Sequence, residues 1–370
     1  VAWGYATTVA SLLLALLMPF LGSIADLKGN KKRLLVGSIG TGAVLLACMG
    51  IPGNAMVFLV MYVVATIMLN ASLVFYDAFL IDATDSEDRY DEVSSQGYAW
   101  GYIGSCVPFI ICLVLVLFGE NFGLGQLDAI RISFVITAVW WVVFSVPVLK
   151  NVHQTHYKER TEHLFCDALV GLWATAKRIF ADKRVFMFML AFFFYIDGVH
   201  TVISMATSYG SALGIDSTQL VLALLVTQFV AFPSAIIYGK LAGRVGTLNM
   251  ILVAVAAYMG IVLFAAFFLK TAFEFWVLAI MVGLFQGGVQ ALSRSYFGRI
   301  IPKEKSNEYY GFFDIFGRYA SVMGTFLVSV VTSLTGNPSL GVLSIGVLLI
   351  VGFMLLVRLS RMTRAAEHAA

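Results

Sequence analysis

Two ionisable side chains lie deep within one long apolar stretch of the sequence, near residues 185–209. If this stretch is a helix that rises ~1.5 Å per residue, Asp197 lies ~18 Å along it. His200 comes three residues later and would share a helical face with Asp197. Ionisable groups are costly inside a membrane and usually serve a function there. The pair therefore predicts a site that binds a cationic group or exchanges a proton, unless the two side chains only hydrogen-bond and pack helices together.

Uncharged polar side chains form a second candidate group. Gln286 and Gln290 are four residues apart in a glycine-rich apolar stretch, so they would share one helical face. Two amides can hydrogen-bond a polar solute, although glutamines also hold membrane helices together. An earlier apolar stretch carries a matching polar face with Asn70, Tyr76 and Asp77. These five residues, with Asp197 and His200, are the predicted substrate and proton site.

A glycine-rich basic segment occurs twice in the sequence, each time after an apolar stretch. GSIADLKGNKKRL begins at Gly22, and GKLAGRVG begins 217 residues later at Gly239. The second copy keeps the glycines of the first but has Gly243 in the place of Asp26. Such an internal repeat is typical of membrane transporters that are built from two parallel halves.

The first copy has the features of a latch. Its glycines permit close helix approach and a tight reversal of the chain. Asp26 lies at a helix end, where it could meet the positive N-terminus of a helix from the other half. Lys31, Lys32 and Arg33 would hold the loop at the anionic inner membrane surface. The alternative to a latch is a loop that only fixes the orientation of the helices in the membrane. The predicted gating residues are Gly22, Asp26, Lys28, Gly29, Lys31, Lys32, Arg294, Asp314 and Arg318.

Three of these predicted gating residues lie outside the hairpin. Arg294 lies near the inner end of its stretch, where the alternative is an anchor that extends its side chain to the membrane surface. Asp314 and Arg318 are four residues apart, so they would neutralise each other within one helix. This pair predicts a structural or gating contact.

The composition is that of a membrane protein. Of the 370 residues, 60% are apolar and 12% are charged, whereas a soluble domain carries roughly 25% charged residues. The four cysteines have no CxxC spacing, and no basic block with interleaved aromatic residues predicts nucleic-acid binding. A weak match to zinc ligands is formed by His153, His156, His163 and Cys166. We therefore expect neither metal nor cofactor, and the absence of Walker, GxSxG and HExxH motifs gives no sign of an enzyme.

Eleven stretches are long and apolar enough to cross a membrane, which takes about 20 residues. They lie near 1–25, 34–51, 56–80, 97–118, 131–149, 185–209, 217–239, 247–269, 274–296, 310–334 and 339–357. If the basic hairpin faces the cytoplasm, the inner connections carry 21 of the 24 basic residues and the outer ones carry 2. This asymmetry follows the positive-inside rule. Because eleven spans would leave the N-terminus outside, we expect a further helix before Val1.

The long connection at 150–184 divides the chain into two predicted helix bundles, 1–149 and 185–358, followed by a cytoplasmic tail at 359–370. One helical face within this connection carries Phe165, Ala168, Leu169, Leu172, Ala176, Ile179 and Phe180. The pattern predicts an amphipathic helix on the inner leaflet of the membrane.

Together these motifs resemble the major facilitator superfamily. The first hairpin has the pattern G-x-x-x-D-x-K-G-x-K-K, although Leu27 stands where that family usually has a basic residue. The segments GGVQALSRS from Gly287, FYIDGV from Phe194 and WGY from Trp3 are similar to its vacuolar amino-acid effluxer-like, autophagy-related branch. The resemblance covers essentially the whole chain and implies an all-α, two-bundle fold with parallel halves. It implies twelve transmembrane helices, of which the first is absent here, and a cavity lined on this chain by 56–80, 185–209 and 274–296.

The residues and the resemblance predict a secondary-active transporter that works by rocker-switch alternating access. A small polar solute such as an amino acid would bind between the halves, with efflux implied by the resemblance and proton coupling through Asp197 and His200 as a hypothesis. The alternative is a transporter-shaped receptor or scaffold without turnover. We expect a monomer in a bacterial cytoplasmic membrane, with both native termini inside and with solute, protons and lipid as its partners.

Overall fold

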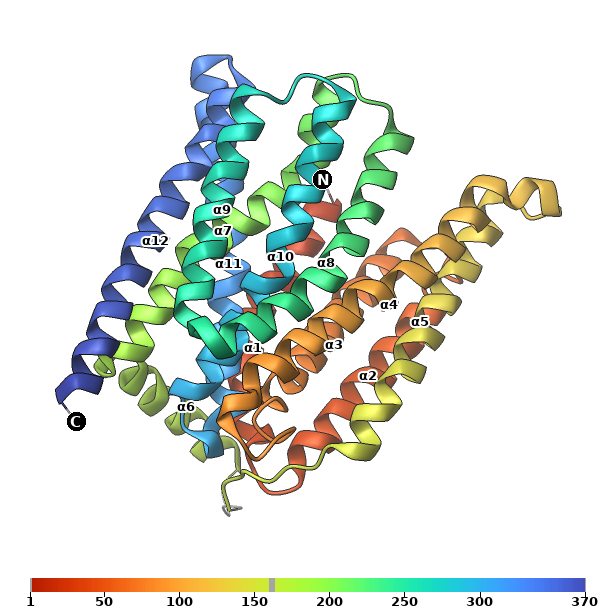
Figure 1. The fold of residues 1–370 in the computed structure, drawn as a ribbon. Coiled ribbons are helices and arrows are strands. Elements are labelled where there is room, and N and C mark those ends of the chain that lie inside the picture. The colour runs from red at the N-terminus through yellow and green to blue at the C-terminus, as the bar shows by residue number, and fades with distance from the viewer. Residues whose placement is uncertain (1, 160–163, 370) are drawn as a thin grey trace. The chain divides into compact units, whose positions relative to one another are not determined.

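The computed structural model describes residues 2–159 and 164–369 and is almost entirely helical (Figure 1). Within these residues the structure has no strand, and one isolated bridge pairs Leu27 with Lys158. Its helices are α1 (Ala2–Ala25), α2 (Asn30–Cys48), α3 (Ala55–Ala78), η1 (Glu87–Arg89), α4 (Tyr90–Phe118), η2 (Gly119–Phe122), α5 (Gln126–Asn151), α6 (Leu164–Ala181), α7 (Lys183–Ala212), α8 (Ser217–Val245), α9 (Thr247–Phe267), α10 (Ala272–Ile300), η3 (Lys303–Lys305), α11 (Ser306–Thr335) and α12 (Pro338–Ala369). The all-α fold class predicted from the sequence is confirmed.

Each of the eleven predicted membrane-spanning stretches forms a helix. In the described part of the chain, ten helices are long and apolar enough to cross a membrane. The exception is α2, which was predicted to span at 34–51 and which instead begins with the polar sequence Asn-Lys-Lys-Arg. Lys31, Lys32 and Arg33 of the hairpin are therefore part of the helix itself.

Short polar residues set the start of several of these apolar helices. The side chain of Asn54 accepts a hydrogen bond from the backbone N–H of Met56 at the start of α3. Asp182 accepts from the N–H groups at the start of α7, and Asp216 does the same for α8. Each side chain pairs an N–H that the helix leaves without an internal partner. The apolar helices therefore begin where the sequence supplies an N-cap.

Contacts divide the chain into two units that exchange short segments. Unit 1 contains Val1–Asp85, Gly104–Ala176 and Ile301–Ile315, and unit 2 contains Ser86–Ile103, Lys177–Ile300 and Phe316–Ala370. Helices α4 and α11 therefore each begin in one unit and continue in the other. The two bundles predicted from the sequence, with their linker and tail, stay a prediction.

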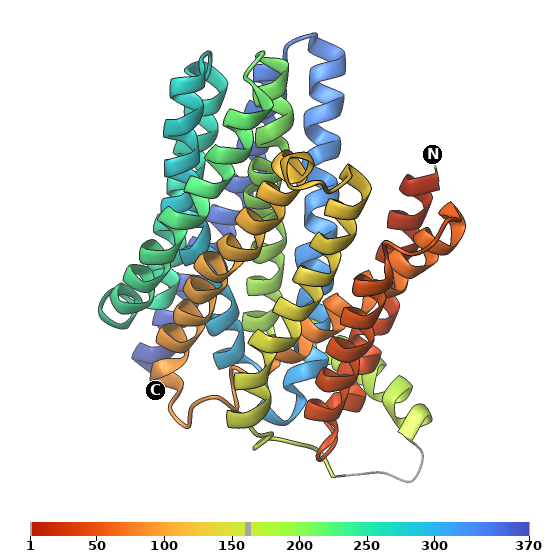
Figure 2. The ribbon, with the colours of Figure 1, turned by 90° about the vertical axis from the view of Figure 1, so that its right-hand side faces the viewer.

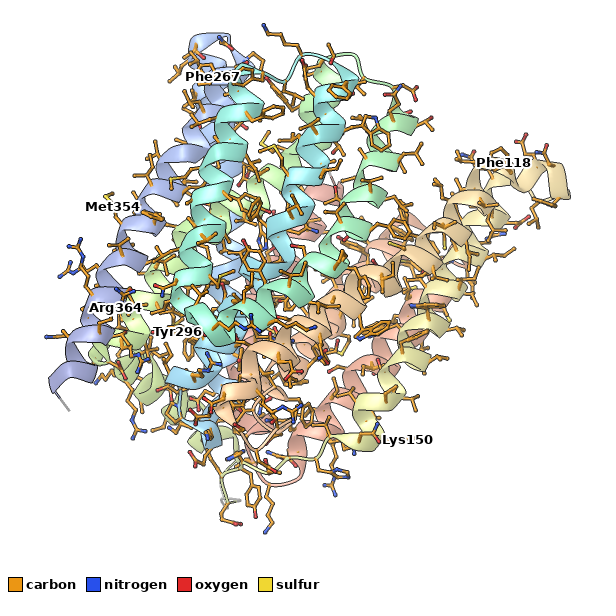
Figure 3. All side chains as sticks on the ribbon, viewed as in Figure 1. Phe118, Lys150, Phe267, Tyr296, Met354 and Arg364 are labelled. Atoms are coloured by element: carbon orange, nitrogen blue, oxygen red, sulfur yellow. The ribbon has the colours of Figure 1, made fainter. Side chains whose placement is uncertain are left out.

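Unit 1 is built around α3, which packs against α1 and α2, while α2 also packs against α5 (Figure 2). Gly42 of α2 lies against the ring of Trp141 of α5, so a larger residue would separate the two helices. Phe118 and Lys150 lie at opposite ends of the α4–α5 pair (Figure 3). The basic end of α5 is thus the end that leads into the linker.

Unit 2 is held by close packing of α7 on α12, of α12 and α10 on α9, and of α10 on α8. Gly198 of α7 faces Leu349, and Gly352 of α12 lies against the backbone of Tyr195. Small residues at such crossings let membrane helices approach closely. Within this unit Arg364 lies toward one end and Phe267 toward the other (Figure 3).

Helix α6 has one buried side and one exposed side. Of the predicted apolar face, Ala168 and Ile179 are buried, whereas Phe180 is 64% exposed. Phe180 instead shares the exposed side with Val170 and Trp173. The side chains of Phe165 and Leu169 lie outside the described residues, and the place of α6 at the inner leaflet stays a prediction.

Replacing Gly288 by alanine is expected to destabilise unit 2, because a Cβ there would overlap the ring of Tyr238. Overpacking of this kind costs about 1–3 kcal/mol. Gly260 of α9 is the matched control, since nothing lies within 4 Å of a Cβ at that position. Gly260→Ala should raise stability by up to ~1 kcal/mol through helix propensity. Thermal unfolding in detergent measures both variants, and equal shifts would contradict the packing argument.

Candidate functional site

The hairpin between α1 and α2 binds the first turn of α11 within unit 1. The Asp26 side chain is buried and accepts hydrogen bonds from the backbone N–H of Asn307 at 2.9 Å, from its side-chain Nδ2 at 2.8 Å and from the N–H of Glu308 at 3.1 Å. These N–H groups have no partner inside the helix and form its positive end. We call this contact the latch. Asp26 meets the N-terminus of a helix, as expected from the sequence. Its gating role, and the expectation that this helix belongs to the other half, stay predictions.

Gly22 lets the hairpin come this close to α11. A Cβ at Gly22 would overlap the carbonyl oxygen of Asn307 and would lie 2.7 Å from its carbonyl carbon. Because those atoms belong to helix backbone, they cannot move aside as a side chain could. Gly29 has φ of 74° and reverses the chain before α2, in a conformation that few other residues adopt without strain.

Lys31 was expected to hold the loop at the membrane surface, and that expectation is wrong. Its side chain is buried and its ammonium lies 2.6 Å from the carboxylate of Asp82, just after α3. The same nitrogen donates to Ser306 at 3.2 Å and to the carbonyl of Ala78 at 3.4 Å. Lys31 therefore joins α2, the end of α3 and the start of α11 from inside.

The other two lysines of the hairpin are less buried. Lys28 is exposed and lies 3.8 Å from Glu159, which is also exposed. Lys32 is half-buried and donates to the carbonyl of Val152 at 3.4 Å. The hairpin thus places one lysine inside the latch and two toward the linker.

Burial and charge act in opposite directions on the pKa values of Asp26 and Asp82. Burial raises the pKa of Asp26 to about 6, although Lys158, Lys31 and the hydrogen bonds from Asn307 oppose that rise. Burial also acts to raise the pKa of Asp82, but there the contacts with Lys31, Thr155 and His156 outweigh it and lower the pKa. As the pH falls, Asp26 therefore takes up a proton before Asp82 does.

The second hairpin makes the equivalent contact within unit 2. A Cβ at Gly239 would lie 2.6 Å from Ser95 in the first turns of α4. Asp91 on that helix is 3% exposed and lies 2.8 Å from Arg299, and it also accepts from Thr247 and Ser295. In unit 2 the buried acid lies on the helix, whereas unit 1 has Asp26 on the hairpin in addition to the buried Glu308 on α11. Sequence reasoning missed Asp91, although it lies 217 residues before Glu308 and could have been found by the offset of the repeat.

Arg294 is not an anchor at the membrane surface. Its side chain is 4% exposed, donates to the Ser94 hydroxyl at 2.9 Å and lies 5.1 Å from the centre of the Tyr98 ring. The surface-anchor alternative is therefore wrong, because α4 supplies an oxygen acceptor and an aromatic face inside unit 2. Arg294 holds α10 to the start of α4.

Asp197 is fully buried in α7. Its Oδ1 accepts from the Thr201 hydroxyl at 3.2 Å and from the backbone N–H of Gly324 at 2.9 Å. Among the described residues, its Oδ2 has no hydrogen-bond partner. His200 bonds the backbone of Gly317 on α11, so Asp197 and His200 each bond α11. The site and the alternative, in which the two side chains only pack helices together, both stay predictions.

The polar residues of α10 and α3 are placed in different units. In unit 2, Gln286 is 4% exposed and Gln290 accepts from the Tyr102 hydroxyl at 3.4 Å. In unit 1, Asn70 is buried and donates to a carbonyl of its own helix. Tyr76 is exposed and Asp77 is half-buried.

Two further groups were predicted from the sequence: the pair Asp314 and Arg318, and the histidines and cysteine of the linker. Asp314 belongs to unit 1 and Arg318 to unit 2, both half-buried, and their mutual neutralisation stays a prediction. His156 hydrogen-bonds the buried carboxylate of Asp82. His163 and the side chain of Cys166 lie outside the described residues, within which no cluster of metal-ligating side chains occurs.

Comparison with known protein families assigns the chain to a family. The family model described as "Vacuole effluxer Atg22 like" matches residues 3–82 and 81–370. The chain belongs to this Atg22-like family. A Bacillus subtilis relative named as an uncharacterised MFS-type transporter, YxiO, is 44% identical over 357 residues, which are 95% of this chain and 83% of the relative. The protein is therefore a multi-pass membrane protein of a transporter family.

More distant relatives support the same family and fold. Autophagy-related protein 22 of Kluyveromyces lactis is 23% identical over 302 residues, and the match covers 75% of this chain and 60% of that protein. The chain thus spans little more than half the length of this fungal relative. The structure of a major facilitator superfamily transporter, FucP, in its outward conformation matches with a TM-score of 0.72 and 13% identity over 96% of this chain and 89% of FucP. This likeness confirms the two-bundle fold of the major facilitator superfamily.

Replacing Lys31 by methionine is expected to lower the unfolding free energy by about 3–5 kcal/mol, because the buried carboxylate of Asp82 would lose its counter-ion. Lys28→Met is the matched control, and loss of its exposed pair should cost about 0–1 kcal/mol. The double variant Lys31→Met with Asp82→Leu should recover much of the loss. Chemical unfolding measures all three, and a double variant as unstable as the single would sink the ion-pair account.

Asp26 should make the protein more stable as the pH falls through about 6. Its pKa is about 6 in the folded protein, above the ordinary value of 3.8, so the folded state binds the proton more tightly than the unfolded state. The stabilisation is complete below the ordinary value and is lost as the pH rises through about 6, an effect of up to ~3 kcal/mol. The difference in unfolding free energy between wild type and Asp26→Asn at pH 4, 5 and 7.5 isolates this group. A difference that does not change with pH would refute the assignment.

Proposed function

We propose that this protein is a secondary-active transporter that moves a small polar solute by alternating access between its two halves. The observation that carries the proposal is Asp197, a buried carboxylate in an apolar helix with one oxygen bonded and the other without a partner among the described residues. Burying such a group is costly and is usually tied to function in membrane helices. The family and fold support a transporter over a passive membrane protein.

The solute we propose is an amino acid, moved in the efflux direction. The family description names a vacuole effluxer, which supports export in this chain by analogy. The polar side chains in the middle of α10, from Val282 to Ser293, are two amides and one hydroxyl, and Gln290 accepts from the hydroxyl of Tyr102 on α4. Neutral donors and acceptors of this kind recognise a compact polar solute by direction rather than by net charge.

Proton coupling through Asp197 is the finer part of the proposal. One carboxylate oxygen is held by Thr201 and Gly324, so the group stays oriented while its charge changes. The other oxygen is then the place for a proton or for the cationic group of the solute. His200 is the second group proposed for proton coupling, and it contacts the backbone of Gly317 on α11. We also propose a bacterial cytoplasmic membrane location and a monomer.

Solute counterflow into proteoliposomes tests the transport proposal. Vesicles preloaded with one amino acid should take up the same labelled amino acid faster than empty vesicles, with saturation. Exchange of a defined group of amino acids supports the proposal and names the substrate class. If correctly folded protein exchanges no amino acid, the amino-acid assignment is wrong, and ligand-dependent stabilisation without flux would favour a non-transporting receptor.

Replacing Asp197 by asparagine should separate coupling from exchange. An imposed pH gradient should drive solute accumulation in wild type and should fail to do so in Asp197→Asn, because the amide cannot take up the proton. Counterflow should continue in the variant. Asp85→Asn, which changes an exposed acid, is the control and should behave as wild type. Gradient-driven accumulation that survives in Asp197→Asn would exclude this residue as the coupling group.

A further inference from the structure

The linker after α5 is bound tightly to the latch hairpin. We call its residues 152–158 the linker strap. The Gln154 side chain accepts from the backbone N–H of Gly29 at 3.0 Å and donates to the carbonyl of Ala25 at 3.1 Å. The Lys158 N–H donates to the carbonyl of Asp26 at 2.7 Å, which helps to form the isolated bridge in this region. The strap thus supplies hydrogen-bond partners to the hairpin backbone on both sides of its turn.

The middle of the strap binds the end of α3. The backbone N–H and the hydroxyl of Thr155 donate to Asp82 at 3.0 and 2.7 Å, and the N–H of His156 donates at 3.1 Å. Asp82 is also the counter-ion of Lys31. One buried carboxylate therefore joins the strap to the lysine that holds the hairpin.

Lys158 carries a positive charge from the strap into the latch. Its ammonium lies 2.7 Å from Oε2 of Glu308 and 4.0 Å from Oδ2 of Asp26. Within the described part of the chain, Lys158 is the cation that pairs with Glu308, whose Oε1 has no hydrogen-bond partner there. Glu308 is fully buried in the first turn of α11. Without Lys158, two buried carboxylates would face each other, and that arrangement is strongly unfavourable.

The charges of the whole cluster depend on the strap. The acids Asp26, Asp82 and Glu308 face the ammonium groups of Lys31 and Lys158, and the imidazole of His156 lies 3.3 Å from Asp82. Lys31 stays in place whenever α2 does, because it belongs to that helix. Lys158 and His156 are present only while the strap is docked. Detachment of the strap therefore leaves the latch with an excess of buried negative charge.

We propose that the linker strap is a detachable lock on the latch and that Lys158 is its positioning residue, which supplies the counter-ion that keeps Glu308 buried at the start of α11. When the strap leaves, Glu308 loses its cation and moves to water, and the first turn of α11 leaves the hairpin with it. The role of this lock in a transport cycle rests on the proposed function; the lock itself does not. The strap is continuous along the chain with α6 and α7, so movement of those helices would pull on it.

Hydrogen–deuterium exchange on the full chain in nanodiscs tests this proposal without any substrate. In Lys158→Met, exchange in segments 22–30 and 303–310 should rise at least ~10-fold, since a hydrogen bond to a charged group contributes about 1.5–3 kcal/mol. Lys158→Arg keeps the charge and should restore slow exchange. Lys150→Met removes an exposed lysine at the end of α5 and should leave both segments as in wild type.

Two results would overturn the lock. One is unchanged exchange of both segments in Lys158→Met. The other is faster exchange spread over all helices and not restored by arginine, which would mark Lys158 as a general structural residue. If Lys158→Met does not fold, Gln154→Ala decides, because it releases the strap without changing charge; faster exchange of the same two segments supports the lock, and no change overturns it.

The counterflow experiment separates this inference from the proposed function. Faster exchange in Lys158→Met together with absent counterflow in wild type would remove the transport proposal and keep the lock as a conformational device. Counterflow in wild type together with unchanged exchange in the variant would remove the lock and keep transport.

Discussion

The structure of unit 1 depends on one constraint, which is the burial of the Asp26 carboxylate against the first turn of α11. A buried carboxylate must be surrounded by donors and cations. The donors are the N–H groups of Asn307 and Glu308, and they can be reached only because Gly22 has no side chain to keep the helix away. The cations are Lys31 and Lys158, and each brings a further segment of chain with it. The hairpin, the end of α3, the linker and α11 thus meet because one charge has to be satisfied.

Unit 2 meets the same requirement with a different set of charged side chains. Gly239 keeps the close approach of hairpin and helix, while the acid is Asp91 on α4 and the cation is Arg299 at the end of α10. What the two halves share is therefore the backbone approach that glycine permits. The sign of each partner is free as long as the buried charges are balanced. This freedom explains why Gly243 can stand in the second hairpin where the first has Asp26.

The sequence predicts the helices well because each is a local property. An apolar stretch of sufficient length is a membrane helix, and residues such as Asp182 and Asp216 mark where it begins. Side-chain partners are not local. Lys31 pairs with Asp82 51 residues away, and Arg294 bonds Ser94 200 residues away. From the sequence, Lys31 is expected at the membrane surface, and a surface anchor is the alternative role for Arg294. The reason is that a basic residue near a helix end is normally solvated. The linker strap was missed for the same reason, since its contacts follow no periodic pattern.

Asp26 and Asp197 are both buried aspartates, but their surroundings suit two different roles. Asp26 has three hydrogen-bond donors and two nearby ammonium groups, so its contact is complete and any opening must break it as a whole. Asp197 has two donors on one oxygen and none on the other among the described residues, and no described cation forms an ion pair with it. A complete contact suits a latch, because it favours one arrangement strongly. An incomplete one suits a coupling site, because the open oxygen gives a proton or a solute a place to bind, and its occupation then changes the charge in the middle of α7.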